Sequence, residues 1–246
     1  MNSYFPPSGN MLLSAIPPAE MAQLHPLLTR VRWVNGQGLH EASERIEQVF
    51  FVEQGFASIV AHADNGVEVG LIGREGMVGY PVLLSPQAVS YNRAMVQTPG
   101  GALRMSALAL RSKLDGVPVL RQLVSDALQV FMAQVAQTAA CNCQHSLLQR
   151  LARWLLLAHD RVDGDELALT QEFLATMLAV RRAGVTNALG SLQAAGLVDQ
   201  RRGRVTICNR PGLEAAACDC YGRVAAFTTT VAAQNPGTPD PADLAA

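Results

Sequence analysis

The sequence lacks the features that mark membrane-spanning proteins, secreted proteins and the commonest enzymes. In its 246 residues, no run approaches the roughly 18 consecutive apolar residues that a bilayer span requires. Residues 1–7 lack the basic start and apolar core of a secretion signal, which favours a cytoplasmic location. No Gly-Xaa-Ser-Xaa-Gly motif, phosphate-binding Gly-Lys loop or dinucleotide fingerprint occurs. The sequence therefore indicates a protein that is not an enzyme and has no membrane partner.

Cysteine is scarce and odd in number, which argues against a disulfide framework and favours reduced thiols. The five residues are Cys141, Cys143, Cys208, Cys218 and Cys220. The two close pairs are spaced i, i+2, and on a helix that spacing points side chains to nearly opposite faces. The five histidines show no metal spacing either. We therefore expect no metal site and no cofactor.

Hydrophobic residues are abundant, at 49% of a 26.3 kDa chain, which excludes a disordered protein and allows two domains. After short helices within residues 11–29, the apolar period changes toward two. Strands are expected at residues 48–53, 57–63, 67–73, 89–97 and 101–107, followed by a short helix at 108–114. Asp64-Asn65-Gly66 is a hairpin signal, because Asn and Gly tolerate the positive φ of a type I′ turn. The first half therefore predicts a small antiparallel β-domain.

Residues 117–141 have the longest helical pattern of the chain. Spacings of three and four recur along one stripe, the predicted seam: Leu120, Val124, Ala127, Phe131, Gln134 and Thr138. Such a stripe is typical of a coiled coil between two copies, although a helix packed on its own β-domain would show it too. We expect the first arrangement, with a hinge at residues 142–144 and a second helix at 145–159.

Residues 170–194 predict two helices joined by a tight turn, which is helix-turn-helix spacing. Thr170 is suited to cap the first helix, and Val180, Val185, Leu189 and Leu192 supply the apolar stripe of the second. Opposite that stripe lies a set of residues whose types read base edges in DNA grooves. The set comprises Arg182, Ala183, Thr186 and Asn187.

Two strand-like runs around an arginine-rich turn follow at residues 196–207, as in a winged helix-turn-helix. The turn carries Arg201, Arg202 and Arg204. Residues 170–210 hold six arginines and two acidic residues, so 6 − 2 gives +4 in a chain of net charge −1. Positive charge is concentrated where DNA would lie. A short helix at 211–221, capped by Asn209, is expected to cover the wing, and residues 233–246 have the composition of a disordered tail.

From Leu169 to Ile207 the sequence resembles the C-terminal DNA-binding domain of Crp/Fnr-type transcription regulators, with Val180-Arg181-Arg182-Ala183-Gly184-Val185-Thr186 where their recognition helix begins. The resemblance implies DNA contacts by Thr170, Arg181 and the groove-reading and wing residues named above. Arg182 keeps the first base-reading role of the family, whereas Ala183 replaces its acid and Asn187 takes the third position. A different operator is therefore expected.

The β-domain resembles the cyclic-nucleotide-binding β-roll of the same family, which implies an effector pocket formed by Gly79, Tyr80, Arg93, Ala94 and Thr138. In the family, a Gly-Glu-Leu triplet and an Arg-Ser-Ala triplet hold the ribose and the cyclic phosphate. Here the ribose-binding acid is replaced by Tyr80 and the serine by Ala94, while Arg93 remains. Arg93 could equally pair with a carboxylate of the β-roll. Cyclic AMP is therefore not the expected effector.

Together these patterns predict an α+β chain. The expected parts are a sensor β-roll (1–116), a dimerisation helix and hinge (117–142), a winged helix-turn-helix domain (143–232) and a tail (233–246). The expected partners are a double-stranded DNA operator, a second copy of the chain, an unidentified small-molecule effector and, as a further candidate, RNA polymerase. The competing interpretation is a ligand-sensing or protein-interaction module whose helix-turn-helix does not read DNA.

Overall fold

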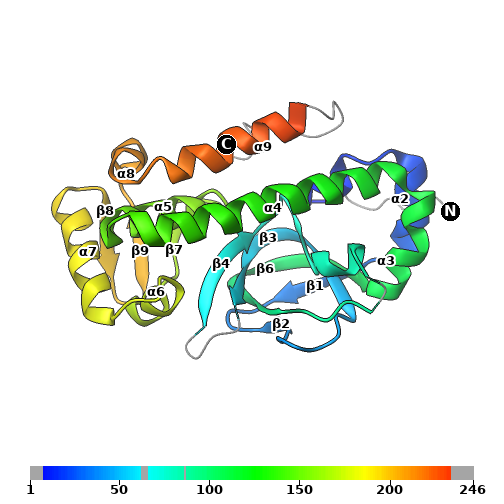
Figure 1. Cartoon of the computed structure of the whole chain (residues 1–246), viewed down its shortest axis with the longest axis horizontal. Helices are drawn as coiled ribbons and strands as arrows, with labels where there is room; N and C mark the ends of the chain where they lie inside the picture. The colour runs from blue at the N-terminus through cyan, green and yellow to red at the C-terminus, as the bar shows by residue number, and fades with distance from the viewer. Residues whose placement is uncertain (1–7, 62–65, 86, 234–246) are drawn as a thin grey trace.

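The computed structural model describes residues 8–61, 66–85 and 87–233. An antiparallel sheet and a smaller helical domain lie at opposite ends of the molecule, and one long helix, α4, runs alongside both (Figure 1). This arrangement confirms the predicted α+β class. No helix in the described part of the chain is long and apolar enough to cross a membrane.

The N-terminal half is the predicted β-domain. Its helical elements are α1 (Met11–Ser14), α2 (Pro18–Leu24), η1 (His25–Leu27), η2 (Tyr80–Leu83), α3 (Ala107–Lys113) and η3 (Leu114–Gly116). Its strands are β1 (Thr29–Trp33), β2 (Gly38–His40), β3 (Gln48–Ala61), β4 (Val67–Ile72), β5 (Met77–Val78) and β6 (Asn92–Ser106). The sheet order is β1-β6-β3-β4, with β2 paired to β6 and β5 paired to β3. β3 and β4 pair antiparallel as the hairpin signal predicted, although its residues Asp64 and Asn65 lie outside the described residues.

Two strands are longer than predicted. β3 joins most of the predicted strands 48–53 and 57–63, and β6 joins most of the predicted strands 89–97 and 101–107. Irregularities at residues 52–57 of β3 bend the pair without separating it. At the bend Gly55 has φ +74°, and Gly100 lies so close that a Cβ on it would stand 2.0 Å from the carbonyl oxygen of Gln54. Gly55 and Gly100 therefore allow the two backbones to approach closely inside β3 and β6. Both glycines lie in the gaps that the sequence analysis left between predicted strands.

Helices α4 (Pro118–Gln144) and α5 (Leu147–His159) follow. α4 ends later than predicted, so Asn142, Cys143 and Gln144 are its last residues and are not the hinge. The break lies at His145 and Ser146. Ser146 caps α5 in a capping box with Gln149, whose side chain accepts from the Ser146 amide, and this reciprocal pair fixes where α5 begins.

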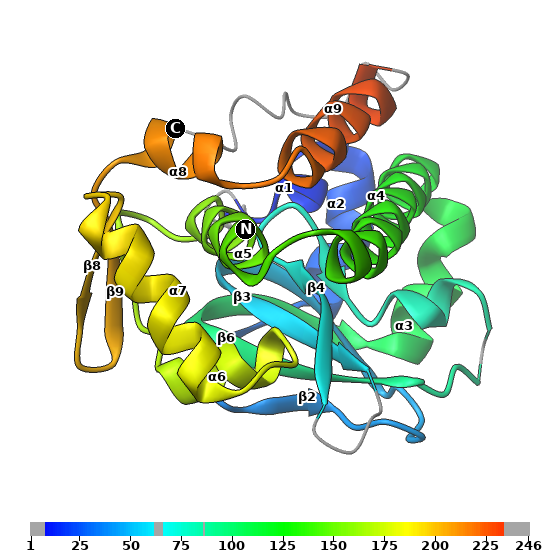
Figure 2. The same ribbon diagram turned by 60° about the vertical axis from the view of Figure 1, so that its left-hand side comes forward.

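The C-terminal part is a winged helix-turn-helix followed by two helices. Its elements are β7 (Glu166–Leu167), α6 (Gln171–Met177), α7 (Arg182–Ala194), β8 (Val198–Arg201), β9 (Arg204–Ile207), α8 (Arg210–Ala216) and α9 (Cys220–Ala233). Asn209 caps α8 as predicted. The single expected helix at 211–221 is wrong, since the chain leaves helical geometry at Ala217 and starts again at Cys220. α9 lies along α4 (Figure 2), and most of the predicted tail, 234–246, falls outside the described residues.

The predicted seam of α4 faces the interior of its own chain, where three of its residues, Leu120, Val124 and Gln134, are buried. Leu120 and Val124 are fully buried in the core of the β-domain. Phe131 stacks at 5.9 Å on Tyr80, and the Gln134 amide bonds both the N–H and the C=O of Leu71 in β4. Half-buried Ala127 packs against the same core, and Thr138 accepts from Arg153 of α5. The stripe exists because the β-sheet and α5 cover it.

Two hydrophobic cores form, and the second crosses the domain boundary. The first fills the β-domain under α1, α2 and α4. The second fills the helix-turn-helix domain and also takes in Phe56 of β3 and Leu71 of β4, both fully buried. The helix-turn-helix domain therefore packs directly on the sheet of its own chain.

Candidate nucleic-acid interface

The helix-turn-helix is built as the sequence predicted. The Thr170 hydroxyl accepts from the Phe173 amide at 3.1 Å and starts α6. The turn passes through Ala179, which has φ +52° although it is not glycine. Arg181 is the N-cap of α7 and makes no side-chain cap bond. α7 therefore depends on packing more than on its own terminus.

That packing comes from one side of α7. Val185, Leu189 and Leu192 are at most 1% exposed and belong to the second core. A Cβ on Gly184 would stand 2.9 Å from a methyl group of Leu147, so a glycine at this position lets α7 approach the start of α5 closely. The apolar side is fixed on α5 and α6, which orients the opposite side outward.

The predicted groove-reading residues all lie on this outer side. Arg182, Ala183, Thr186 and Asn187 are exposed. They belong to α7, which lies at one end of the molecule (Figure 1). The Thr186 hydroxyl is 2.7 Å from Gln171 Oε1 and 3.1 Å from the Arg182 carbonyl oxygen. Thr186 is thus already engaged within the helix-turn-helix, while no ion pair engages Arg182 among the described residues.

The wing presents three exposed arginines with different partners. Arg201 pairs with Asp199 at 3.1 Å and Arg204 pairs with Glu166 at 2.7 Å. Arg202 stands at the tip beside Gly203, whose φ is +75°, and has no acidic partner in the described part of the chain. Of these three, Arg202 is therefore the guanidinium most available to a phosphate.

Arg210 does not belong to this positive surface, although the sequence count included it. Its guanidinium donates to Asp160 at 2.6 Å and Glu214 at 3.0 Å, and also bonds the Tyr221 hydroxyl. Desolvation lowers the pKa of Arg210, but the bond and charge of Asp160 outweigh it, so the net pKa is raised. Arg210 joins α8 to α5 and the start of α9.

The residues predicted for the effector pocket differ in burial and in their contacts. Arg93 pairs with Glu41 at 3.2 Å on the exposed edge near β2, while Ala94 is fully buried in the core. Gly79 has φ +107° and precedes η2. The Tyr80 hydroxyl accepts from the Met77 amide at 3.2 Å, and burial raises the pKa of Tyr80. Tyr80 thus fills the space beside Phe131.

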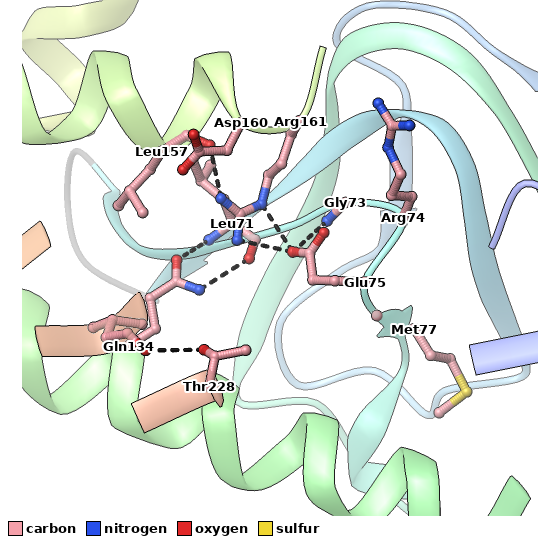
Figure 3. A network of polar contacts seen from close by, with 12 residues as sticks. Leu71, Gly73, Arg74, Glu75, Met77, Gln134, Leu157, Asp160, Arg161 and Thr228 are labelled. Atoms are coloured by element: carbon pink, nitrogen blue, oxygen red, sulfur yellow. Dashed lines mark hydrogen bonds and ion pairs between the residues drawn. The ribbon is translucent and has the colours of Figure 1, made fainter. Parts of the chain in front are cut away.

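A cavity of about 260 Å³, lined in part by Tyr80 and Phe131, lies between the β4–β5 turn, α4 and α9. It is mostly apolar, with Leu123, Val130 and Val224 in its wall, and Arg161 and Glu75 form an ion pair of 2.8 Å at its edge. Figure 3 shows Gln134 and Leu71 beside that pair. Sequence reasoning missed this cavity, because α9, which closes it, was not predicted.

Comparisons with known proteins agree with this geometry. The family model of the Crp-like helix-turn-helix domain matches residues 149–216. FixK2 from Bradyrhizobium japonicum has a similar structure at 14% identity and TM-score 0.65, covering 78% of this chain and 98% of its own. A CRP-family transcriptional regulator from Thermus thermophilus is similar at 21% identity and TM-score 0.63, covering 76% and 96%.

A third similar structure is the regulator CLP from Xanthomonas campestris, which is described as responsive to c-di-GMP. It shares 18% identity and a TM-score of 0.62, over 78% of this chain and 99% of its own. The search of curated proteins gave no significant match. At these identities the structural likeness establishes the fold.

Proposed function

We propose that the chain is a Crp/Fnr-type regulator that binds a near-palindromic operator in double-stranded DNA as a homodimer and regulates transcription, because it has the fold of such regulators and a Crp-like helix-turn-helix domain at residues 149–216. α7 enters the major groove in this proposal. RNA polymerase is a candidate partner of the bound protein, and the effector is unidentified.

The observation that carries the proposal is the outward side of α7. It presents Arg182 and Asn187 on a helix whose other side is locked into a core. An arginine fork bonds guanine O6 and N7 together, and an asparagine amide does the same for adenine N6 and N7. Ala183 replaces a larger side chain and leaves room for a thymine methyl. Rigid support matters, because a base contact requires a fixed side-chain origin.

The wing supplies contacts of a different kind. Arg202 at the tip has no acid to compete with a phosphate, whereas Arg201 and Arg204 would have to exchange Asp199 and Glu166 for the DNA backbone. Phosphate contacts hold a protein on DNA without reading its sequence. We therefore assign base recognition to α7 and backbone binding first to Arg202.

Two substitutions separate these roles. Arg182→Ala should lose about 1 to 3 kcal/mol at the correct operator and relax base preference there, because a bidentate contact disappears. Arg202→Ala should weaken binding to the operator and to random DNA by the same factor. It should also reduce the slope of log affinity against log salt concentration by about one, because about one counterion fewer is released. Genomic footprinting identifies the operator, and fluorescence anisotropy over a salt series measures both effects.

Arg32→Ala is the matched control, because Arg32 is an exposed arginine on β1, far from α7. It should leave affinity and salt slope unchanged. Failure of the wild-type chain to prefer any genomic fragment over random DNA would refute the proposal and favour a module whose helix-turn-helix does not read DNA. Equal losses from Arg182→Ala on operator and random DNA would refute the role of Arg182.

A near-palindromic operator has two half-sites related by two-fold symmetry, so we propose that two copies of the chain bind it. The half-sites should lie about 34 Å apart, one turn of DNA, or a multiple of that distance. We assign the contact to the most exposed side of α4, on which only Leu128 packs partly against the first core. Its residues recur at spacings of three and four, as a two-stranded coiled coil requires. They are Ser125, Leu128, Met132, Val135, Ala139 and Asn142.

Met132 is the residue that tests this face, because it is a large apolar side chain that is 64% exposed in the single chain. Met132→Asp should give folded monomers by light scattering, since a charge would be buried at the contact. Phe131→Asp is the comparison: it places a charge against Tyr80 and should lower the thermal midpoint of the chain itself. A dimer that survives Met132→Asp would refute this face.

A further inference from the structure

Four metal-binding side chains meet where α4 ends and α9 begins. They are Cys141 in the last turn of α4, His145 directly after it, and Cys218 and Cys220 at the junction of α8 and α9. Their ligand atoms all lie within 4.8 Å of one another. The three cysteines are at most 5% exposed and form a buried cluster separate from both hydrophobic cores.

The backbone explains how this cluster forms, and why the pair spacing was misleading. Cys141 and Cys143 do diverge on α4, which leaves Cys143 exposed. Cys218 and Cys220 do not lie within one helix, because Ala217 is extended at φ −75° and ψ 169° and α9 starts only at Cys220. His145 is also extended, at φ −117° and ψ 150°, so its ring comes near Cys220.

The distances suit a single tetrahedral ion. Cys141 Sγ is 3.4 Å from Cys218 Sγ, and Cys220 Sγ is 3.5 Å from His145 Nδ1. Zinc bonds of about 2.3 Å to sulfur and about 2.0 Å to nitrogen place neighbouring ligand atoms about 3.5 to 3.8 Å apart in a tetrahedron. Iron–sulfur clusters are held mostly by four cysteine thiolates and need room for several iron and sulfide ions. We propose that Cys141, His145, Cys218 and Cys220 bind one Zn²⁺.

The surroundings match the charge of such a site. Three thiolates and Zn²⁺ carry −3 + 2 = −1, and Arg153 of α5, only 5% exposed, supplies a compensating positive charge. Its Nε atom is buried without a hydrogen-bond partner among the described residues. Gln137 Nε2 donates to Cys220 Sγ at 2.9 Å, as outer-shell groups do around metal ligands.

The position of the site gives zinc a structural role at the hinge. Cys141 and His145 lie just before α5, whereas Cys218 lies just before α9 and Cys220 is its first residue. One ion bound to all four joins the end of α4 to the start of α9, and so fixes the domain that carries α7 relative to α4. Metal loss would release this connection without touching the outward side of α7.

The experiment uses the full chain, purified with a reductant and without chelators. Elemental analysis should find one zinc per chain, and replacement by Co²⁺ should give the absorption of a tetrahedral thiolate site. Cys218→Ser and Cys220→Ser should lose the bound zinc. The matched controls Cys143→Ser and Cys208→Ser should keep it, because both cysteines are exposed and outside the cluster.

Several results would overturn the proposal. They are a chain that takes up no zinc after dialysis against Zn²⁺, an iron–sulfur spectrum, a Cys141 to Cys218 disulfide found by mass spectrometry under reducing purification, or equal zinc loss in the control variants. If the serine variants fail to fold, X-ray absorption of the wild-type chain decides, with three sulfur ligands and one nitrogen ligand expected. All readouts are taken without DNA, so they stand apart from the test of operator binding.

Discussion

A buried carboxyl group joins the two domains and makes the stability of the chain depend on pH. Glu68 on β4 is 5% exposed and accepts from the Ser58 hydroxyl and from the indole N–H of Trp154 on α5, each at 2.5 Å. Burial raises the pKa of Glu68 from 4.5 to about 7, although both hydrogen bonds favour the charged form. Desolvation by burial outweighs the two hydrogen bonds, because the carboxyl group is almost completely buried.

The direction of the effect follows from proton binding. Between pH 4.5 and 7 the folded chain holds a proton on Glu68 that the unfolded chain has released, so folding becomes less favourable as pH rises. The shift of about 2.5 pH units corresponds to about 3 kcal/mol. His40 acts oppositely: burial lowers its pKa to about 4, so its contribution to stability is lost as pH falls from 6.5 toward 4. The two effects partly cancel in the wild-type chain.

Glu68→Gln isolates the carboxyl term, because the amide has the same size and does not titrate. The substitution leaves one amide N–H₂ group facing a donor, which costs about 1 to 3 kcal/mol at every pH. The quantity to compare is therefore the difference in the free energy of unfolding between the wild-type chain and Glu68→Gln, measured at each pH. From pH 4.5 to 8, the wild-type chain should lose about 3 kcal/mol relative to Glu68→Gln.

Urea unfolding followed by tryptophan fluorescence at several pH values measures this difference, since Trp154 itself donates to Glu68. Glu44→Gln serves as the control, because Glu44 is an exposed glutamate of the same domain. Its curve should run parallel to that of the wild-type chain. If the Glu68→Gln curve were also parallel to the wild type, the raised pKa of Glu68 would be wrong.

Three further predictions concern backbone geometry and the effector. Ala179→Gly should stabilise the chain by about 0.5 to 1 kcal/mol, because Ala179 is exposed and strained at φ +52°; a loss of stability in urea unfolding would contradict this. Gly100→Ala should cost at least about 1 to 3 kcal/mol, whereas Gly101→Ala, whose Cβ would meet only a carbonyl oxygen at 3.4 Å, should cost much less; equal thermal midpoints would refute the close approach to Gln54. Cyclic AMP and cyclic GMP should show no micromolar binding in isothermal titration, because Glu41 occupies Arg93 and no acid replaces the one missing at Tyr80; tight binding that also sharpens operator affinity would refute this reading of the pocket.

The sequence predicted those parts of the fold that local signals determine. Thr170 is a cap in both the prediction and the structure, and β3 and β4 pair as the Asn-Gly signal indicated. In both cases a few neighbouring residues set the backbone geometry. The base-reading assignment of Arg182 and Asn187 depends equally on local helical spacing, although their contacts with DNA are still a prediction.

The partners of α4 could not be predicted from its own residues. Stripes at spacings of three and four occur on more than one side of this helix, through Leu120 and Val124 on one side and through Met132 and Val135 on another. Periodicity shows that a side of a helix is apolar, but not which element covers it. The sheet covers the first stripe and α9 a neighbouring side, and α9 was itself missed because its sequence is rich in Ala and Thr and has few large apolar residues.

The same limit applies to the residues that hold the two domains together. Cys141 and Cys218 are 77 positions apart, Trp154 and Glu68 are 86 apart, and Gln134 and Leu71 are 63 apart. No spacing rule connects such pairs, since each depends on how the domain carrying α7 rests on the sheet. Phe56 and Leu71 fix that placement from the sheet side by entering the second core. Because α7 belongs to that core, a change at Leu71 of β4 has a continuous packed path to the helix that carries the residues proposed to read DNA.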